Sequence, residues 1–217
     1  MHNDFVSLYF REKVELFNQL DFGLISLLVD RIIFTYQKNG IVFTLGNGGG
    51  VSVANGFSVD LRTHPFTLED KTKTTEIPRL RVVDFTESSG MLTGIANDVG
   101  GEFMFSEQFK NWINPAVPNS RDNTLVVFSG SGNSKNVIQA VRTAINLGVY
   151  TVCISGRGGG EAANLVDLPI VVPGSSKFPG QTGKNDNNFH IEDLQISIGH
   201  IIVGLLKHSV STTYGSK

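Results

Sequence analysis

Stretches rich in apolar residues alternate along the chain with longer segments in which apolar residues recur at helical spacing. The apolar stretches at 41–45, 80–85, 125–128, 149–155 and 168–172 suit strands buried on both faces of a sheet. Segments with helical spacing lie between and after these strands. This alternation predicts an α/β fold, a mostly parallel sheet with helices on both faces. Helices are expected over 51–61, 90–97, 102–113, 135–145, 161–166 and 190–208.

Two further helices are predicted over 4–21 and 23–38, and both carry large apolar residues around more than one face. The final helix, 190–208, has the same character, because apolar residues also occur outside its broad apolar face. Helices of this kind usually have a second surface to bury. We therefore expect a subunit interface, with a homotetramer as the prediction and a dimer as the alternative. Burial in one large intramolecular core is the other possibility.

The sequence SGSGNS at 129–134 joins a predicted buried strand to a predicted helix. The first N–H groups of a helix are unpaired and its N-terminus is electropositive, so such a turn is suited to an anion. Ser129, Ser131 and Ser134 add hydroxyl donors. The Walker pattern is absent, so we expect a single phosphate on a small molecule and no nucleotide cofactor. A serine-capped loop with nothing bound is the alternative.

A second glycine-rich loop, GNGGG at 46–50, follows another predicted strand, and a third lies at 156–160. Loops at the carboxyl edge of a parallel sheet converge on one crevice, so these loops are expected near residues 129–134. Two longer polar segments lack an apolar period. We expect 62–77 to be an exposed loop and 173–189 to be a functional lid or a mobile segment.

Composition and charge limit the number of domains, the partners and the location to be expected. Its 217 residues, 40% of them hydrophobic, suffice for one α/β domain, with a helical hairpin expected at 1–38 and an α/β core at 41–208. A net charge of −2 and a pI near 6.2 favour neither nucleic acid nor a membrane as partner. The single cysteine, Cys153, is expected to pack as a small hydrophobe. The start lacks a leader pattern and the apolar segment 196–206 is too short to span a bilayer, so a cytoplasmic protein is expected.

Two ionisable residues stand out because apolar residues flank them. Asp60 lies between Val59 and Leu61, and His200 lies in an isoleucine-rich helix. A carboxylate and an imidazole in such surroundings are the usual groups for moving a proton near neutral pH. Glu192, eight residues before His200, lies about 80° away around the helix, so both side chains could face one crevice. The alternatives are a solvent-facing aspartate and a hydrogen-bonded core histidine.

Several of these motifs together resemble a known family. The likeness is to the sugar-isomerase (SIS) domains and specifically to the phosphoheptose isomerases, and it covers roughly residues 5–208. The motifs that carry it are, in order, GNGG at 46–49, AND at 96–98, SGSGNS at 129–134, GRGG at 156–159 and IEDLQISIGH at 191–200.

The resemblance implies a fold, an assembly and an activity. It implies a three-layer αβα sandwich with a five-stranded parallel sheet, assembled as a homotetramer with active sites between subunits. The family interconverts sedoheptulose 7-phosphate and an aldoheptose 7-phosphate through an enediol, a step toward surface-polysaccharide precursors. The implied proton-transfer pair is Asp60 and His200. The implied substrate-binding residues are Ser129, Gly130, Ser131 and Ser134 for the phosphate, with Asn47, Gly48, Gly49, Asn97, Asp98 and Glu192 around the sugar.

The chain departs from the family at the sugar end of the implied site. A family glutamate is Asp60 here, a loop serine is Gly50, and some members bind zinc with a histidine and a glutamine that are Gly56 and Glu192 here. A metal site made of Asp60, Glu192 and His200 would be an oxygen-rich set. These departures leave a second function open, a non-catalytic SIS module that binds a phosphosugar or, as in a replication-initiator-binding branch, a protein.

Overall fold

The computed structural model describes residues 2–68, 73–116, 120–181 and 188–214. Five strands form a single sheet in the order β2-β1-β3-β4-β5, and every neighbouring pair is parallel. This confirms the predicted α/β class and the five-stranded parallel sheet. The strands are β1 (Ile41–Gly46), β2 (Arg81–Asp84), β3 (Thr124–Ser129), β4 (Tyr150–Ser155) and β5 (Leu168–Val171).

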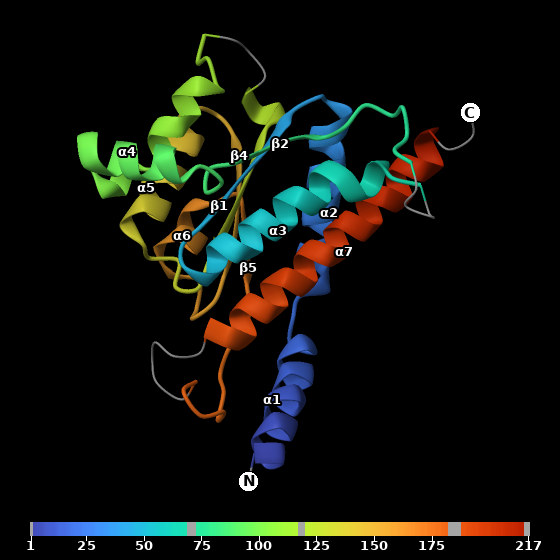
Figure 1. Ribbon diagram of the computed structural model, residues 1–217, viewed down its shortest axis with the longest axis vertical. Helices are drawn as coiled ribbons and strands as arrows, with labels where there is room; N and C mark the ends of the chain where they lie inside the picture. Colours follow the sequence, from blue (N-terminus) through green and yellow to red (C-terminus); the bar gives the residue numbers. More distant parts are fainter. Residues whose placement is uncertain (1, 69–72, 117–119, 182–187, 215–217) are drawn as a thin grey trace.

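Helices cover both faces of this sheet and make three layers (Figure 1). Alternate residues of β1, β3 and β4 enter different cores, as Val126 and Val127 of β3 show. One core lies under α2, α3 and α7, and the other lies under α5, α6 and a pair of 3₁₀ helices. The α-helices are α1 (His2–Phe17), α2 (Phe22–Gln37), α3 (Gly49–Thr63), α4 (Ser89–Asp98), α5 (Lys135–Asn146), α6 (Gly160–Leu165) and α7 (Asn188–Tyr214).

The prediction of an α-helix over 102–113 is wrong. The segment forms two 3₁₀ helices, η2 (Gly101–Phe103) and η3 (Ser106–Asn111). The side-chain amide of Gln108 donates to the carbonyl oxygen of Met104, the acceptor that a regular α-helix offers to the Gln108 N–H. That N–H bonds instead to Phe105 one residue closer along the chain, which is the 3₁₀ pattern.

Two other boundaries differ from expectation. α7 continues to Tyr214 rather than ending at 208. The polar segment 62–77 is not wholly an exposed loop, because α3 extends to Thr63 and a 3₁₀ turn, η1 (His64–Phe66), buries Phe66. Parts of the two long polar segments, 69–72 and 182–187, lie outside the described residues.

The first helix projects from the body of the domain (Figure 1). α1 packs mainly against α7 rather than folding back along α2 as the predicted hairpin. Leu16 is its one buried apolar residue among those described, whereas Phe10 and Val14 are 60% and 61% exposed. Most of the apolar surface that the sequence places on α1 is therefore uncovered within a single chain.

The last helix provides much of one core. By length and composition its segment Phe189–Thr213 could cross a membrane, the one such helix in the described part of the chain. Half of that apolar stretch is buried in the protein, and Ile198 and Ile202 are completely so. α7 is therefore a core helix of the domain, and its length gives little support for a membrane span.

Candidate functional site

The two loops singled out in the sequence lie next to each other at the carboxyl edge of the sheet. β1 and β3 are neighbours, with Gly46 opposite Phe128. α3 then leaves toward one face and α5 toward the other, the arrangement that opens a crevice in a parallel sheet. The side-chain amides of Asn47 and Asn136 join the loops by a reciprocal pair of hydrogen bonds, 2.8 and 3.0 Å. Asn136 was not among the predicted site residues. Its place in the first turn of α5 was the available signal, because that position puts a polar side chain at the crevice.

The serines of the 129–134 loop differ in burial: one is buried and two are partly exposed. Ser129 is buried and its Oγ accepts the Gly132 N–H at 2.9 Å, so this serine shapes the turn from within. Ser131 is partly exposed, and Ser134 begins α5 without a side-chain capping bond. Ser131 Oγ accepts the Asn133 N–H at 3.3 Å, and both hydroxyls lie near the N-terminus of α5, where they can donate to an anion.

The glycine-rich loop at 156–160 packs against the serine-rich loop at 129–134. Gly132 has a φ of 65°, and a Cβ there would lie 1.9 Å from the carbonyl oxygen of Gly159. The Gly132 carbonyl accepts the Ala162 N–H, and the Asn133 side chain accepts the Glu161 N–H. The loop at 156–160 thus fixes the shape of the 129–134 loop, which explains its glycines without a direct role in binding.

The glycine-rich loop at 46–50 brings α3 and α7 into close contact. Gly48 has a φ of 56°, and the N-terminus of α3 begins there without a side-chain cap. The Glu192 carboxylate lies against Gly49, where an added Cβ would be 2.2 Å from Oε1. Burial and the nearby Asp193 carboxylate raise the Glu192 pKa above its ordinary value. Glu192 therefore places an acceptor at the crevice, beside a helix N-terminus that favours negative charge.

The predicted carboxylate–imidazole pair does form. His200 Nε2 is 3.8 Å from Asp60 Oδ2, across the contact between α3 and α7. The expectation of apolar surroundings is wrong for the two side chains, which are 68% and 38% exposed respectively. Leu61 and Ile198 are buried in the core, but Val59 is 52% exposed, so Asp60 and His200 lie at the outer side of their helices. A hollow of about 120 Å³ lies beside them, lined by Ser52, Val53, Gly56, Phe57, Gln195, Ile196, Gly199 and His200.

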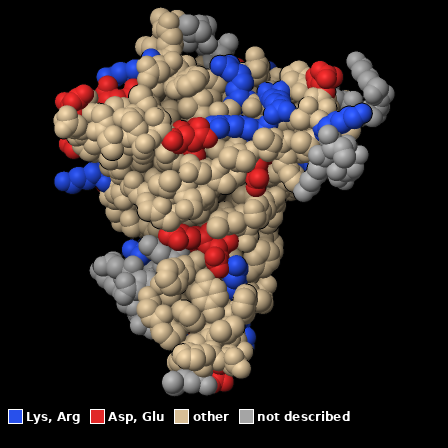
Figure 2. Space-filling model, viewed as in Figure 1, with Lys and Arg blue, Asp and Glu red and all other residues tan. Residues whose placement is uncertain are grey.

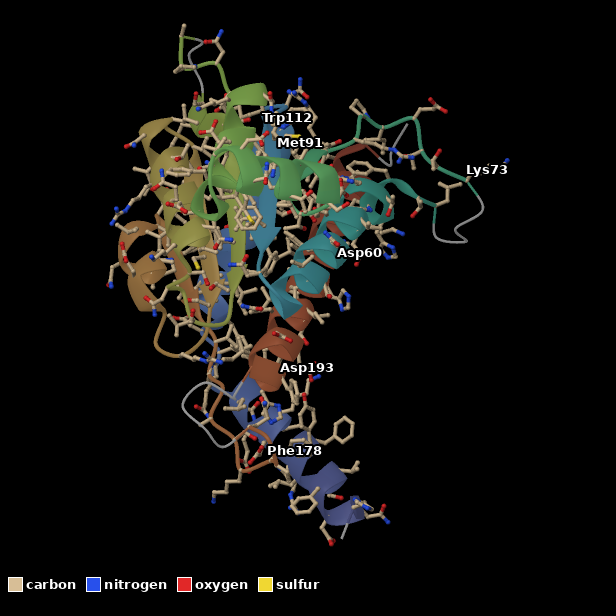
Figure 3. All side chains as sticks on the ribbon, turned by 60° about the vertical axis from the view of Figure 1, so that its left-hand side comes forward. Asp60, Lys73, Met91, Trp112, Phe178 and Asp193 are labelled. Atoms are coloured by element: carbon tan, nitrogen blue, oxygen red, sulfur yellow. The ribbon has the colours of Figure 1, made fainter. Side chains whose placement is uncertain are left out.

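Glu192 does not join that pair, so the three proposed metal ligands do not converge. Its carboxylate contacts residue 49, about 16 Å along the α3 axis from residue 60 at about 1.5 Å per residue. Figure 3 shows Asp60 and Asp193, the residue after Glu192, well apart on this layer. No group of three potential ligands occurs among the residues that the structure describes. The donor set, as arranged here, does not fit one ion.

Asn97 and Asp98 lie apart from both loops. They end α4, where both are exposed and hydrogen-bonded to each other at 2.8 Å. Within the described segments, no hydrogen bond ties either side chain to the crevice. α4 itself has no buried residue, so this helix lies loosely on its own chain.

Gln195 is a positioning residue that sequence reasoning missed. It is 1% exposed, and its side-chain amide donates to the carbonyl oxygens of Ile154 and Ser129 at 2.6 and 3.3 Å. It therefore fixes α7 on the carboxyl ends of β3 and β4, between Glu192 and His200. The available signal was a polar residue within the apolar stripe of a core helix.

A serine-rich loop at a helix N-terminus, where neighbouring strands lead to opposite faces of the sheet, is the arrangement of an αβα domain suited to a phosphosugar. The carboxylate–imidazole pair lies further along α3 and α7. Comparison with known proteins gives the family. The chain is 36% identical to the phosphoheptose isomerase of Campylobacter concisus over 71% of this chain and 74% of that protein. It is 33% identical to that of Helicobacter pylori strain P12, over 80% and 78%. The chain belongs to the phosphoheptose isomerase family.

Solved structures agree on the fold. The phosphoheptose isomerase of Neisseria gonorrhoeae superposes with a TM-score of 0.75 at 22% identity, covering 96% of this chain and all of that one. No protein-family model matches the chain. Membership confirms the resemblance drawn from the motifs and makes the chain an aldose–ketose isomerase of phosphosugars. The non-catalytic alternative is not favoured.

Proposed function

We propose that this enzyme interconverts sedoheptulose 7-phosphate and an aldoheptose 7-phosphate. The observation that carries the proposal is the Asp60–His200 pair on the helices that border the anion-binding crevice. The family relationship supports the substrate class, since the curated relatives are named for a phosphorylated heptose. A cytoplasmic location and a role in making surface-polysaccharide precursors follow as predictions.

The phosphate would bind at the N-terminus of α5. Ser131 and Ser134 offer hydroxyl donors there, and the backbone near Gly130 allows close approach. Ser129 supports this loop through its bond to Gly132. Asn47 and Glu192, at the adjoining glycine-rich loop, are placed to bind sugar hydroxyl groups through an amide and a carboxylate.

The proton transfer would use the two exposed side chains. As the proposed base, Asp60 removes a proton from C1 of the ketose, the C1–C2 double bond forms, and O2 gains a proton to give the enediol. Collapse of the enediol returns a proton to C2 and releases the proton on O1, which gives the aldose. His200, 3.8 Å from Asp60, carries protons between O1 and O2. Asp60, Glu192 and His200 do not converge within one chain, so these steps are assigned to the side chains alone.

The assembly is part of the proposal. Exposed apolar residues gather on α1 and α2, among them Phe10, Val14 and Leu27. The protruding end in Figure 2 is largely free of charged side chains on the face shown. Burial of this surface favours the proposed homotetramer. Asn97 and Asp98, exposed on a loosely packed helix, would then reach the site of a neighbouring subunit and place active sites between chains.

Light scattering tests this assembly. We expect a tetramer at micromolar concentration, and Phe10→Ser with Val14→Ser to shift it to smaller species, because both changes remove exposed apolar surface. Lys110→Ser, at an exposed position on η3, is the matched control and should not change the mass. A monomer in the unsubstituted protein would contradict the assembly.

Turnover tests the proposed activity. We expect aldose phosphate to form from ketose 7-phosphate and the unphosphorylated ketose to react poorly, because the serine-rich loop binds the phosphate. Ser131→Ala should raise KM for the phosphorylated substrate about tenfold, the usual effect of losing a hydrogen bond to a charged group. Equal rates with phosphorylated and free sugar would contradict this use of the loop.

A further inference from the structure

One face of α1 carries polar residues toward α7, in contrast to its exposed apolar side. Tyr9, Glu12 and Lys13 are three and four positions apart and therefore share a face of the helix. Tyr9 and Lys13 both bond to Asp193 Oδ2, at 2.8 and 2.9 Å. Figure 3 shows Asp193 where α1 meets the start of α7, with Phe178 alongside α1.

Glu12 lies at the centre of this contact, and its side chain is 11% exposed. It accepts hydrogen bonds from Ser176 Oγ at 2.5 Å, from the Lys177 N–H at 2.6 Å and from His190 Nε2 at 3.1 Å. Burial alone would raise the Glu12 pKa, but these bonds outweigh it and keep the pKa below its ordinary value. We call Glu12, Ser176, Lys177 and His190 the Glu12 network.

The network reaches the first turn of α7 through His190. This residue is fully buried, and its ring is stacked on Tyr9 with centroids 4.2 Å apart. His190 and Asp193 are thus both held by α1, one through Glu12 and Tyr9, the other through Tyr9 and Lys13. Glu192 lies between them in sequence and turns to the other side, where it contacts Gly49.

We propose that Glu12 is a positioning residue for the isomerase site. Glu12 acts through His190 to keep the Glu192 carboxylate against the glycine-rich loop at 46–50. The inference rests on the proposed function, in which Glu192 binds the sugar. It gives α1 a role in the chemistry of its own chain, although α1 contributes no residue to the crevice. A carboxylate suits this place because it accepts several hydrogen bonds at once, whereas an amide would turn an N–H group toward a donor.

Loss of the network is expected to affect the site more than the fold. α1 buries little apolar surface against the body, with Leu16 its one buried apolar residue among those described. The sheet and both cores are formed by other elements. The serine-rich loop lies on β3 and α5, which carry none of the network's residues.

Glu12→Gln tests the inference, with Glu15→Gln as the matched control. Glu15 is one turn away, exposed, and lines the same hollow of about 330 Å³ between α1 and residues 175–177. In Glu12→Gln we expect kcat/KM for the ketose phosphate to fall about 10- to 100-fold, mainly through KM, as for a binding group displaced by about 1 Å. The inhibition constant of inorganic phosphate should stay within about twofold of its value in the unsubstituted protein, as should every parameter of Glu15→Gln.

Hydrogen exchange gives a second measurement that does not need turnover. We expect faster amide exchange over residues 189–195 in Glu12→Gln and unchanged exchange over α5. Unchanged exchange at 189–195, or an equal loss of phosphate binding, would overturn the positioning role. Unchanged kinetics with faster exchange would overturn its link to the sugar site. If the unsubstituted protein were inactive, the proposed function would be contradicted, and with it the link between Glu12 and the sugar site.

Discussion

His200→Ala is expected to lower kcat for ketose phosphate isomerisation by about 10²- to 10⁴-fold, the usual contribution of a positioned proton-transfer group. The imidazole is 3.8 Å from Asp60 and 68% exposed, so its removal leaves neither a core cavity nor an unpaired buried group. KM should change little, because the group acts mainly in the transition state. Steady-state kinetics with the heptulose phosphate measures both parameters.

His208 provides the matched control for this substitution. It is an exposed histidine on the same helix, two turns further on and away from Asp60. His208→Ala should keep kcat within about twofold, in keeping with a surface change remote from the site. If His200→Ala were to retain full kcat, the Asp60–His200 pair would not carry the proton transfer.

Gly132→Ala is expected to abolish phosphate binding and to destabilise the protein. At a φ of 65°, an added Cβ would lie 1.9 Å from the Gly159 carbonyl oxygen, so the serine-rich loop must move. Left-handed backbone costs a non-glycine residue about 1–2 kcal/mol, and the overlap adds about 1–3 kcal/mol. Calorimetric titration with inorganic phosphate and thermal unfolding measure the two effects.

Gly158→Ala separates backbone strain from the steric overlap. Its φ is 80°, in the same left-handed region, but an added Cβ would meet nothing within 4 Å. This variant should lose about 1–2 kcal/mol of stability and still bind phosphate. Phosphate binding retained by Gly132→Ala, or lost equally in both variants, would contradict the role given to the 129–134 loop.

Most of the architecture could be predicted from residue patterns. Uninterrupted apolar stretches such as 125–128 identify strands buried on both faces, and a polar glycine-containing turn before a helix identifies the crevice. One exception lies at 102–113, where the side-chain amide of Gln108 donates to the Met104 carbonyl oxygen. Apolar spacing does not encode that competition.

The site was predicted only in part, because residue identity does not give direction. Asp60 and His200 have apolar neighbours in sequence but face solvent, since a helix turns successive residues to different sides. Glu192 shares α7 with His200, yet its carboxylate lies against Gly49 and away from the Asp60–His200 pair. The bond between Glu12 and His190 joins residues 178 positions apart, which no local pattern reveals.

The reaction proposed for this chain is the movement of a proton between C1 and C2 of a ketose phosphate. It is tested most directly by incubating the enzyme with sedoheptulose 7-phosphate in deuterated water and following the reaction by NMR. We expect aldoheptose 7-phosphate with deuterium at C2, deuterium at C1 of the recovered ketose, and at least a hundredfold slower appearance of both with His200→Ala. The absence of both deuterium exchange and aldose product, with and without added divalent metal, would contradict the proposed reaction.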